Sequence, residues 1–168
     1  MNLERIIAVR NNKIVYRDGD ICIKVFNNGF SKADILNEAL NQARAEETGI
    51  NIPKLLEVTV IDGKWSIVSE YIKGKTLEQL FFENPEKNEE YLKLFVEIQI
   101  NMQKRECQLP WRVKDKMNTK IGMAELSAEL KHKLYNMLNK SPECDKLCHG
   151  DFDFSNVIIT PEGVPYIL

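Results

Sequence analysis

The sequence predicts an α+β protein in which an antiparallel sheet of five strands carries one long helix and is followed by a mostly helical region. Three observations support this fold class. Short β-rich segments separated by turn residues fill most of the first third of the chain, and one segment with helix start and stop signals interrupts the strands. From Thr76 onward, apolar residues recur at the spacing of a helix instead.

The five predicted strands come from segments rich in β-branched and aromatic residues. In chain order they lie in RIIAV, KIVYR, ICIKVF, KLLEVTV and KWSIVSEYI. Asp18, Gly19 and Asp20 provide a turn between the second and third strands, and Asp62 and Gly63 provide one between the last two. The first three strands therefore form an antiparallel meander, and the helix falls between the third and fourth strands.

The long helix is predicted from about Ser31 to Thr48. Ser31 is a suitable N-cap, Asp34 provides an acid three residues later, and Gly49 is a typical stop. The residues between these signals are good helix formers, so the segment is expected to form one continuous helix.

The second half of the chain has helical periodicity and ends in a hairpin. TLEQLFF predicts a short helix, and residues 86–103 predict a longer one whose apolar stripe consists of Tyr91, Phe95, Ile98 and Met102. A further stripe consists of Leu126, Leu130, Leu134 and Met137. Both stripes are expected to face the core. NVIIT and VPYIL flank PEG, which predicts two strands joined by a turn.

Composition and charge argue against several classes of protein. The 168 residues are 43% hydrophobic and carry a formal net charge of -2, with 23 basic and 25 acidic side chains. Because no strongly basic region is present, nucleic-acid binding is not expected. No apolar run is long enough to span a membrane, and MNLERIIAVR lacks the apolar core of a signal peptide. The sequence therefore predicts a cytoplasmic protein without a membrane partner.

The four cysteines show no disulfide framework, and reduced thiols are predicted. They are Cys22, Cys107, Cys144 and Cys148. Together with His149, the last two resemble part of a zinc site, but no fourth ligand is evident and the spacing fits no common zinc pattern.

Near the end of the chain, CHGDFDFSN contains three polar residues at the spacing H-x-D-x-x-x-x-N. In phosphoryl-transfer loops of this spacing, the aspartate accepts a hydroxyl proton and the asparagine binds a metal ion. His149, Asp151 and Asn156 occupy these positions. The alternative is a polar turn before a buried strand.

A lysine and a glutamate form the second candidate pair. Lys24 lies between apolar residues in ICIKVF, where kinases place the lysine that neutralises nucleotide phosphates. Glu38, in the second turn of the predicted helix, is the expected partner of Lys24. The alternatives are a solvent-facing strand lysine and an exposed helix carboxylate.

Several motifs in order resemble the aminoglycoside phosphotransferase and choline kinase family, in particular its bacterial members of unassigned substrate. They are VYRDGDICIKVF, LNEALNQARAEETGINIPKLLEV, IVSEYIKGKTLEQL and LCHGDFDFSNVIIT. This resemblance implies a protein-kinase-like, two-lobed fold. Residues 1–73 would form the nucleotide-binding N-lobe, and residues 74–168 the first part of a helical C-lobe with the catalytic loop and hairpin. ATP and Mg²⁺ are the implied cofactors, and a small-molecule hydroxyl is the implied acceptor.

The resemblance also implies roles for residues outside these motifs. Backbone groups near Glu70 and Ile72 would hold the adenine edge, and His149 would support the catalytic loop. Residues 10–15 correspond to the loop over the phosphates, although RNNKIVY contains no glycine. Asparagine tolerates a left-handed backbone, so a tight turn at Asn11 and Asn12 remains open.

Two further departures from the family pattern concern the catalytic chemistry. Asp153, Phe154 and Ser155 stand where relatives often have histidine, proline and glycine. Asp153 is expected to add uncompensated negative charge near the metal site. The family's metal-chelating aspartate would come directly after Leu168, and an incomplete C-lobe is therefore expected.

The function expected from this resemblance is ATP-dependent transfer of the γ-phosphate to a small-molecule hydroxyl. For the 168 residues by themselves, impaired ATP binding and little turnover are expected. The alternative is a pseudokinase-like module that binds a nucleotide or a partner without catalysis. In either case, the incomplete C-lobe predicts an apolar surface open to self-association.

Overall fold

A computed structural model describes residues 1–109, 112–144 and 146–168. The chain divides into two compact units. Unit 1 comprises residues 1–107 and 146–168, and unit 2 comprises residues 108–145. Each unit is described by itself.

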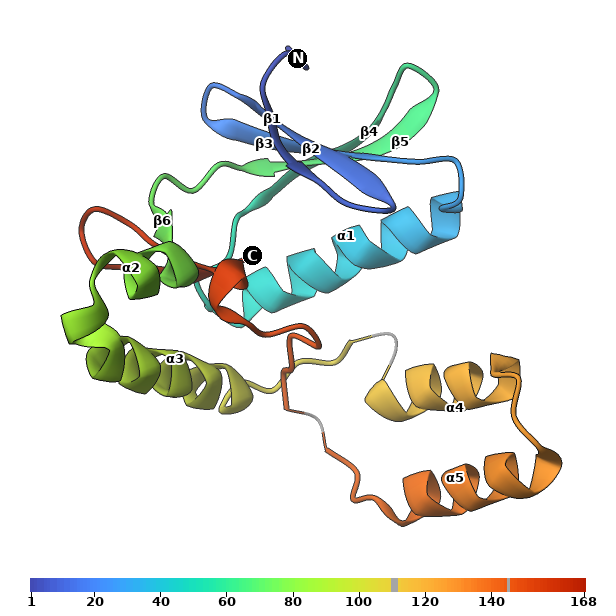
Figure 1. The fold of residues 1–168 in the computed structure, drawn as a ribbon. Coiled ribbons are helices and arrows are strands. Elements are labelled where there is room, and N and C mark those ends of the chain that lie inside the picture. Colours follow the sequence, from blue (N-terminus) through green and yellow to red (C-terminus); the bar gives the residue numbers. More distant parts are fainter. Residues whose placement is uncertain (110–111, 145) are drawn as a thin grey trace. The chain divides into compact units, whose positions relative to one another are not determined.

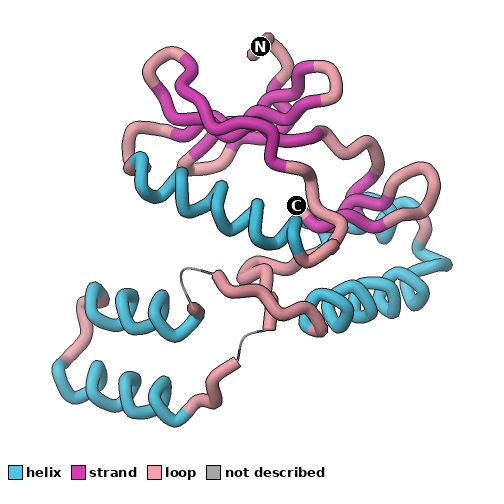
Figure 2. The backbone as a smooth tube through the Cα atoms, turned by 180° about the vertical axis from the view of Figure 1, so that it is seen from behind, coloured by secondary structure: helices cyan, strands magenta, loops and turns pink. Residues whose placement is uncertain are grey.

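The first half of unit 1 is a five-stranded antiparallel sheet with one long helix (Figure 1). Its strands are β1 (Ile6–Val9), β2 (Lys13–Asp18), β3 (Ile21–Phe26), β4 (Leu55–Ile61) and β5 (Lys64–Glu70), in the spatial order β1-β2-β3-β5-β4. The helix α1 (Lys32–Glu47) runs along one face of this sheet (Figure 2). These elements confirm the predicted fold class and the order of three strands, a helix and two strands.

The ends of α1 form where the sequence predicts them. The Ser31 side chain accepts a hydrogen bond from the N–H of Asp34, and the Asp34 carboxylate accepts one from the N–H of Ser31. This reciprocal cap satisfies two amide groups that have no partner inside the helix. Thr48 is the C-cap.

Two small cores lie on opposite faces of the sheet. Phe26 and Ile67 pack with Ile35 and Ala39 of α1, whereas the other face buries Ile23, Val25 and Val68. Because side chains alternate along a strand, the residues of β3 divide between these two faces. Lys24 therefore shares the α1-covered face with Phe26.

The second half of unit 1 combines helices with a small sheet. Its elements are β6 (Lys75–Thr76), α2 (Leu77–Glu83), a 3₁₀ turn (Pro85–Lys87), α3 (Asn88–Gln103), a second 3₁₀ turn (Phe154–Asn156), β7 (Val157–Ile159) and β8 (Pro165–Ile167). The strands pair in the order β6-β7-β8. The predicted hairpin is confirmed. Of the predicted stripe of α3, Ile98 and Met102 are buried, whereas Tyr91 and Phe95 are half-buried. Strand β6 is too short to show any sequence periodicity.

The segment between α1 and β4 is attached to the second half of unit 1. The carbonyl of Asn51 accepts a hydrogen bond from the N–H of Ile167 (2.9 Å), and the Asn51 side-chain amide donates to the carbonyl of Pro165 (3.2 Å). The Arg105 guanidinium donates to the carbonyl of Thr48 (3.0 Å). Both β8 and the end of α3 are thereby connected to the helix that covers the five-stranded sheet.

Gly74 lies where the chain passes from the large sheet to the small one. A Cβ atom at this position would overlap the carbonyl oxygen of Ile159 and lie 2.6 Å from Cγ2 of Ile158. Both of these residues belong to β7. Only glycine therefore permits this close approach of the two backbones.

Gly74→Ala is expected to destabilise the protein by about 2 kcal/mol, because the added methyl group forces β6 away from β7. Urea unfolding followed by circular dichroism measures this change. Gly163→Ala is the comparison. Gly163 has a φ of 81° and no atom near its Cβ position, so only backbone strain of about 1 kcal/mol is expected there. Equal effects of the two substitutions would contradict the steric explanation.

Unit 2 is a helical hairpin of α4 (Val113–Met123) and α5 (Ala128–Lys140). The prediction that its apolar stripe is core is wrong, because Leu130 and Met137 are 42% and 60% exposed. Leu126 precedes α5 and is also exposed. Two short helices offer each other too little surface to bury a whole stripe. In the described part of the chain, no helix is long and apolar enough to cross a bilayer.

Candidate functional site

The first part of the site is an ion pair between the sheet and α1. Nζ of Lys24 lies 3.6 Å from Oε1 of Glu38. Glu38 is adjacent to Ala39, which packs on the sheet, so the helix is held at the distance that the pair requires. The predicted ion pair is confirmed. The two side chains are 26% and 33% exposed, and the pair therefore remains accessible to a ligand.

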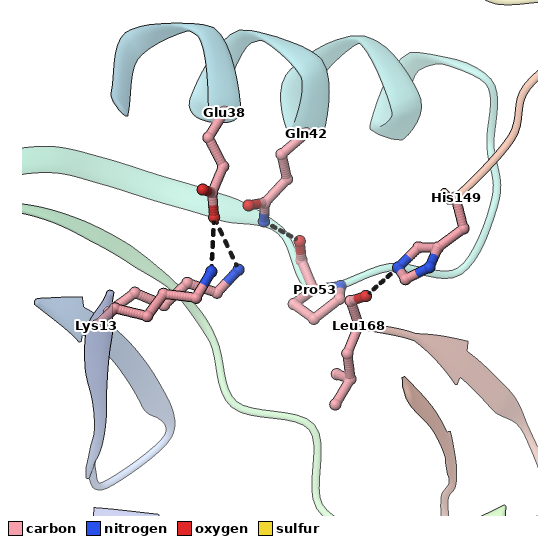
Figure 3. A network of polar contacts seen from close by, with 7 residues as sticks. Lys13, Glu38, Gln42, Pro53, His149 and Leu168 are labelled. Atoms are coloured by element: carbon pink, nitrogen blue, oxygen red, sulfur yellow. Dashed lines mark hydrogen bonds and ion pairs between the residues drawn. The ribbon is translucent and has the colours of Figure 1, made fainter. Parts of the chain in front are cut away.

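A second ammonium group binds the same carboxylate oxygen. Nζ of Lys13, at the start of β2, lies 3.2 Å from Oε1 of Glu38 (Figure 3). Lys13 was not among the site residues predicted from the sequence. The register of the β2–β3 hairpin could have identified Lys13. Val15 pairs with Lys24, and Lys13 lies two residues before Val15. Lys13 and Lys24 therefore share one face of the sheet.

The turn between β1 and β2 is fixed through its carbonyl groups. The Asn27 side-chain amide donates to the carbonyl of Asn11 (3.0 Å), and the N–H of Asn27 donates to the carbonyl of Asn12 (2.9 Å). Neither Asn11 nor Asn12 has a positive φ, so the left-handed turn considered from the sequence is not formed. The segment lacks both the glycines and the left-handed backbone that are typical of phosphate-binding loops.

Glu70 and Ile72 lie where the chain leaves β5. The N–H of Glu70 donates to the carbonyl of Lys54 (2.9 Å), and the N–H of Tyr71 donates to the carbonyl of Asp20 (2.8 Å). Ile72 is buried, and its N–H forms no hydrogen bond with another residue that the structure describes. This free donor is compatible with the predicted adenine contact, which stays a prediction.

Asp151 and Asn156 are held in one loop. Nδ2 of Asn156 donates to the backbone carbonyl of Asp151 (2.8 Å). Gly150 has a φ of 86°, a left-handed conformation that allows a sharp change of chain direction before Asp151. Within the described residues, neither the Asp151 carboxylate nor Oδ1 of Asn156 forms a hydrogen bond or ion pair. Both oxygen-bearing groups are therefore free to contact a ligand.

His149 connects this loop to Leu168, the residue that directly follows β8. Its Nε2 lies 2.6 Å from the backbone carbonyl of Leu168. Because a carbonyl oxygen only accepts hydrogen bonds, Nε2 carries the proton. Nδ1 is buried and has no hydrogen-bond partner in the described part of the chain. The predicted supporting role of His149 is compatible with this contact.

Asp153 has a local structural role. Its Oδ1 accepts hydrogen bonds from the N–H of Ser155 (2.7 Å), the hydroxyl of Ser155 (2.6 Å) and the N–H of Asn156 (3.1 Å). The Ser155 hydroxyl is the main cause of a lowered pKa of the Asp153 carboxyl, and the two backbone donors add to it. The expectation of an uncompensated charge is therefore wrong, because these donors stabilise the carboxylate.

Asp153→Ala is expected to destabilise the protein by about 1 kcal/mol, because three donors lose their acceptor. Asp153→Asn retains a carbonyl acceptor and is expected to have a smaller effect. The lowered pKa means that the stabilisation by the carboxylate is present above the unfolded-state pKa and is lost as the pH falls through the folded-state pKa. Urea unfolding at several pH values should therefore show the wild type and Asp153→Asn converging as the pH falls below the unfolded-state pKa of about 3.9 and through the lower folded-state pKa. A constant difference would contradict this role.

Aromatic rings support the other side of the loop that contains Asp151 and Asn156. The ring of Phe95 on α3 stacks on Phe152 at a centroid distance of 4.4 Å and meets Phe154 edge-on at 4.5 Å. Phe81 of α2 lies 5.2 Å from Phe154. The rings of Phe95, Phe152 and Phe154 border an open cavity of about 510 Å³ that Glu78, Asp153 and Ser155 also line. Phe154 thus anchors the loop to α2 and α3.

The free oxygens of the loop suit a hard cation. Carboxylate and amide oxygens are preferred ligands of Mg²⁺, which commonly completes its coordination with substrate phosphates and water. The described residues contain no group of three or more His, Cys, Asp or Glu side chains arranged to bind a metal ion.

Comparison with known proteins gives a structural relative. No protein-family model and no curated protein sequence matches the chain. Among solved structures, a choline/ethanolamine kinase family protein from Mesorhizobium loti aligns with all of this chain at a TM-score of 0.60. The chain has a kinase-like fold. The two sequences are 20% identical, so this likeness establishes the fold alone, and the chain spans 57% of the length of that protein.

Proposed function

We propose that this kinase-like chain is part of a phosphotransferase that moves the γ-phosphate of ATP to the hydroxyl group of a small molecule. The observation that carries the proposal is the Lys24–Glu38 ion pair, which lies in the same unit as a loop that leaves Asp151 and Asn156 free. A lysine, its glutamate partner, a base and a metal-binding amide are four of the parts that kinases use for phosphoryl transfer.

Each residue has a distinct role in this proposal. Lys24 neutralises phosphate charge, and Glu38 keeps its ammonium group in place. Asp151 accepts the proton of the acceptor hydroxyl. His149 supports the loop through the carbonyl of Leu168, and Oδ1 of Asn156 is available to a metal ion. Mg²⁺, when bound with the nucleotide, would neutralise the charge that develops on the phosphates.

The proposal is tested by measuring phosphate transfer directly. The 168-residue chain, at high concentration, is incubated with γ-³²P-labelled ATP, Mg²⁺ and a panel of alcohols that includes amino sugars, quaternary ammonium alcohols and neutral sugars. Labelled product is separated and identified by mass spectrometry. Single-turnover conditions are appropriate because slow turnover is expected from the sequence. Acceptor-dependent product supports the proposal, whereas its absence with every alcohol contradicts catalysis by these residues.

A second candidate is a nucleotide-binding module without catalysis. The turn at Asn11 and Asn12 favours it, because this turn is fixed to Asn27 and offers no glycine backbone to the phosphates. Nuclear magnetic resonance titration with Mg·ATP separates the two candidates. Saturable shifts in the amide signals of Lys24 and Ile72 without any phosphate transfer would favour this second candidate.

A further inference from the structure

We propose that Lys13 is a second phosphate-binding residue, and that the ammonium groups of Lys13 and Lys24 together replace the glycine-rich backbone that other kinases place around the phosphates. This inference rests on the proposed function, since it concerns the same nucleotide site. It assigns phosphate recognition to two side chains on one face of the sheet.

The charges around Glu38 leave an excess of positive charge. Lys13 and Lys24 lie 3.2 Å and 3.6 Å from the same oxygen, so their nitrogens cannot be farther apart than the sum of these two distances. One carboxylate compensates one ammonium group, and no other carboxylate of the described residues forms an ion pair with either lysine. A polyphosphate carries several negative charges and can contact both nitrogens at once. The partial exposure of both lysines allows such a ligand to reach them.

Lys13 is held in position before any ligand binds. Its ammonium nitrogen lies 5.1 Å from the ring centroid of Phe26, and Phe26 is almost fully buried beneath α1. Lys13 also pairs with Phe26 across the β2–β3 ladder. A cation over an aromatic face is stabilised by the ring, which limits the directions that the Lys13 side chain can take. Less conformational freedom then remains to be lost when a phosphate binds.

The backbone of the neighbouring turn is poorly suited to replace these side chains. The N–H of Arg10 already donates to the carbonyl of Lys13 (2.9 Å), and Asn27 holds the carbonyls of Asn11 and Asn12. A phosphate-binding concavity requires several consecutive N–H groups that point to one spot, usually through a left-handed residue. Since Asn11 and Asn12 have negative φ values, the turn forms no such concavity, and the ammonium groups of Lys13 and Lys24 are available to contact a phosphate instead.

The competing explanation is that Lys13 only positions Glu38. The two explanations differ in what they predict for ligands with and without phosphate. A phosphate contact affects ATP but not adenosine, whereas a distorted site affects both ligands. If Lys13 only positions Glu38, replacing Lys13 would also change the rotamer of Glu38. The backbone signals of α1 would then change even in the absence of any ligand.

The test compares four variants of the full 168-residue chain by two-dimensional nuclear magnetic resonance, which measures weak binding without requiring activity. The variants are Lys13→Met, Lys13→Arg, Lys24→Met and, as a control for loss of one positive charge, Lys64→Met on the exposed end of β5. Each is titrated with Mg·ATP and with adenosine. Lys13→Met is expected to weaken ATP binding about tenfold and to leave adenosine binding unchanged. Lys13→Arg is expected to retain most of the ATP affinity, and Lys64→Met all of it.

Failure of this inference is distinguishable from failure of the proposed function. If Lys24→Met weakens ATP binding and Lys13→Met does not, the inference about Lys13 is wrong and the nucleotide site stands. Equal losses for ATP and adenosine in Lys13→Met would also overturn it, in favour of a positioning role. If the wild type binds neither ligand, the proposed function and the inference are both wrong.

Discussion

Asp151→Asn is expected to lower the rate of phosphate transfer by at least about a hundredfold, because the amide cannot accept the hydroxyl proton as the acceptor attacks. The substitution changes neither the size of the side chain nor the hydrogen bond between the Asn156 side chain and the Asp151 backbone. ATP affinity is therefore expected to remain within about twofold of the wild type. Single-turnover transfer of label and a parallel ATP titration measure the two quantities.

The matched control is Asp153→Asn, the same chemical change two residues away. The Asp153 carboxylate is occupied by donors from Ser155 and Asn156, so its replacement is expected to affect local stability more than the chemical step. If the two variants lose activity equally, Asp151 has no special role as a base. A large loss in Asp153→Asn alone would move that role to Asp153.

Ile35→Ala is expected to destabilise unit 1 by about 3 kcal/mol, because it removes a fully buried side chain and leaves a cavity between α1 and the sheet. Ile35 packs with Phe26 and Ile67, the residues on which the helix rests. Urea unfolding gives the change in free energy. The same substitution is expected to loosen Glu38 one turn later, and the amide signals of Lys13 and Lys24 should shift.

Leu36→Ala is the control for this prediction. Leu36 is the next residue of α1 and is 44% exposed, so its truncation is expected to cost less than about 1 kcal/mol. A loss in Leu36→Ala as large as that in Ile35→Ala would mean that α1 packs on the sheet through a different face.

Features encoded by neighbouring residues were predictable. Ser31 and Asp34 cap α1 as expected, since a capping box needs only two residues at a fixed spacing. The pair of Lys24 and Glu38 was predictable for a similar reason. A strand followed directly by a helix that packs on it brings a residue of each together. The loop that contains Asp151 and Asn156 likewise lies within one short segment.

Features that depend on distant residues or on subtle local bonding were missed. Lys13 and Glu38 are in contact although 25 positions separate them in the sequence. Predicting this contact requires knowledge of the strand register. Without the register, a lysine after a turn resembles an ordinary surface residue. The prediction that the Asp153 charge is uncompensated was wrong, because it considered the charge alone and not the hydrogen-bond donors of Ser155 and Asn156. The stripe through Leu130 and Met137 correctly indicated a helix, but a helical period does not reveal what covers the helix.

The hydrogen bonds of Asn51 to β8 restrain motion within unit 1. The chain crosses between the two halves of this unit near Ile72, and the hydrogen bonds of Asn51 add a second connection. The guanidinium of Arg105 adds a third connection at the end of α1. Hinge closure requires a few residues that can absorb a rotation, and three separate connections oppose such a rotation. We therefore expect the lysine pair to keep a nearly constant separation from Asp151 when a ligand binds.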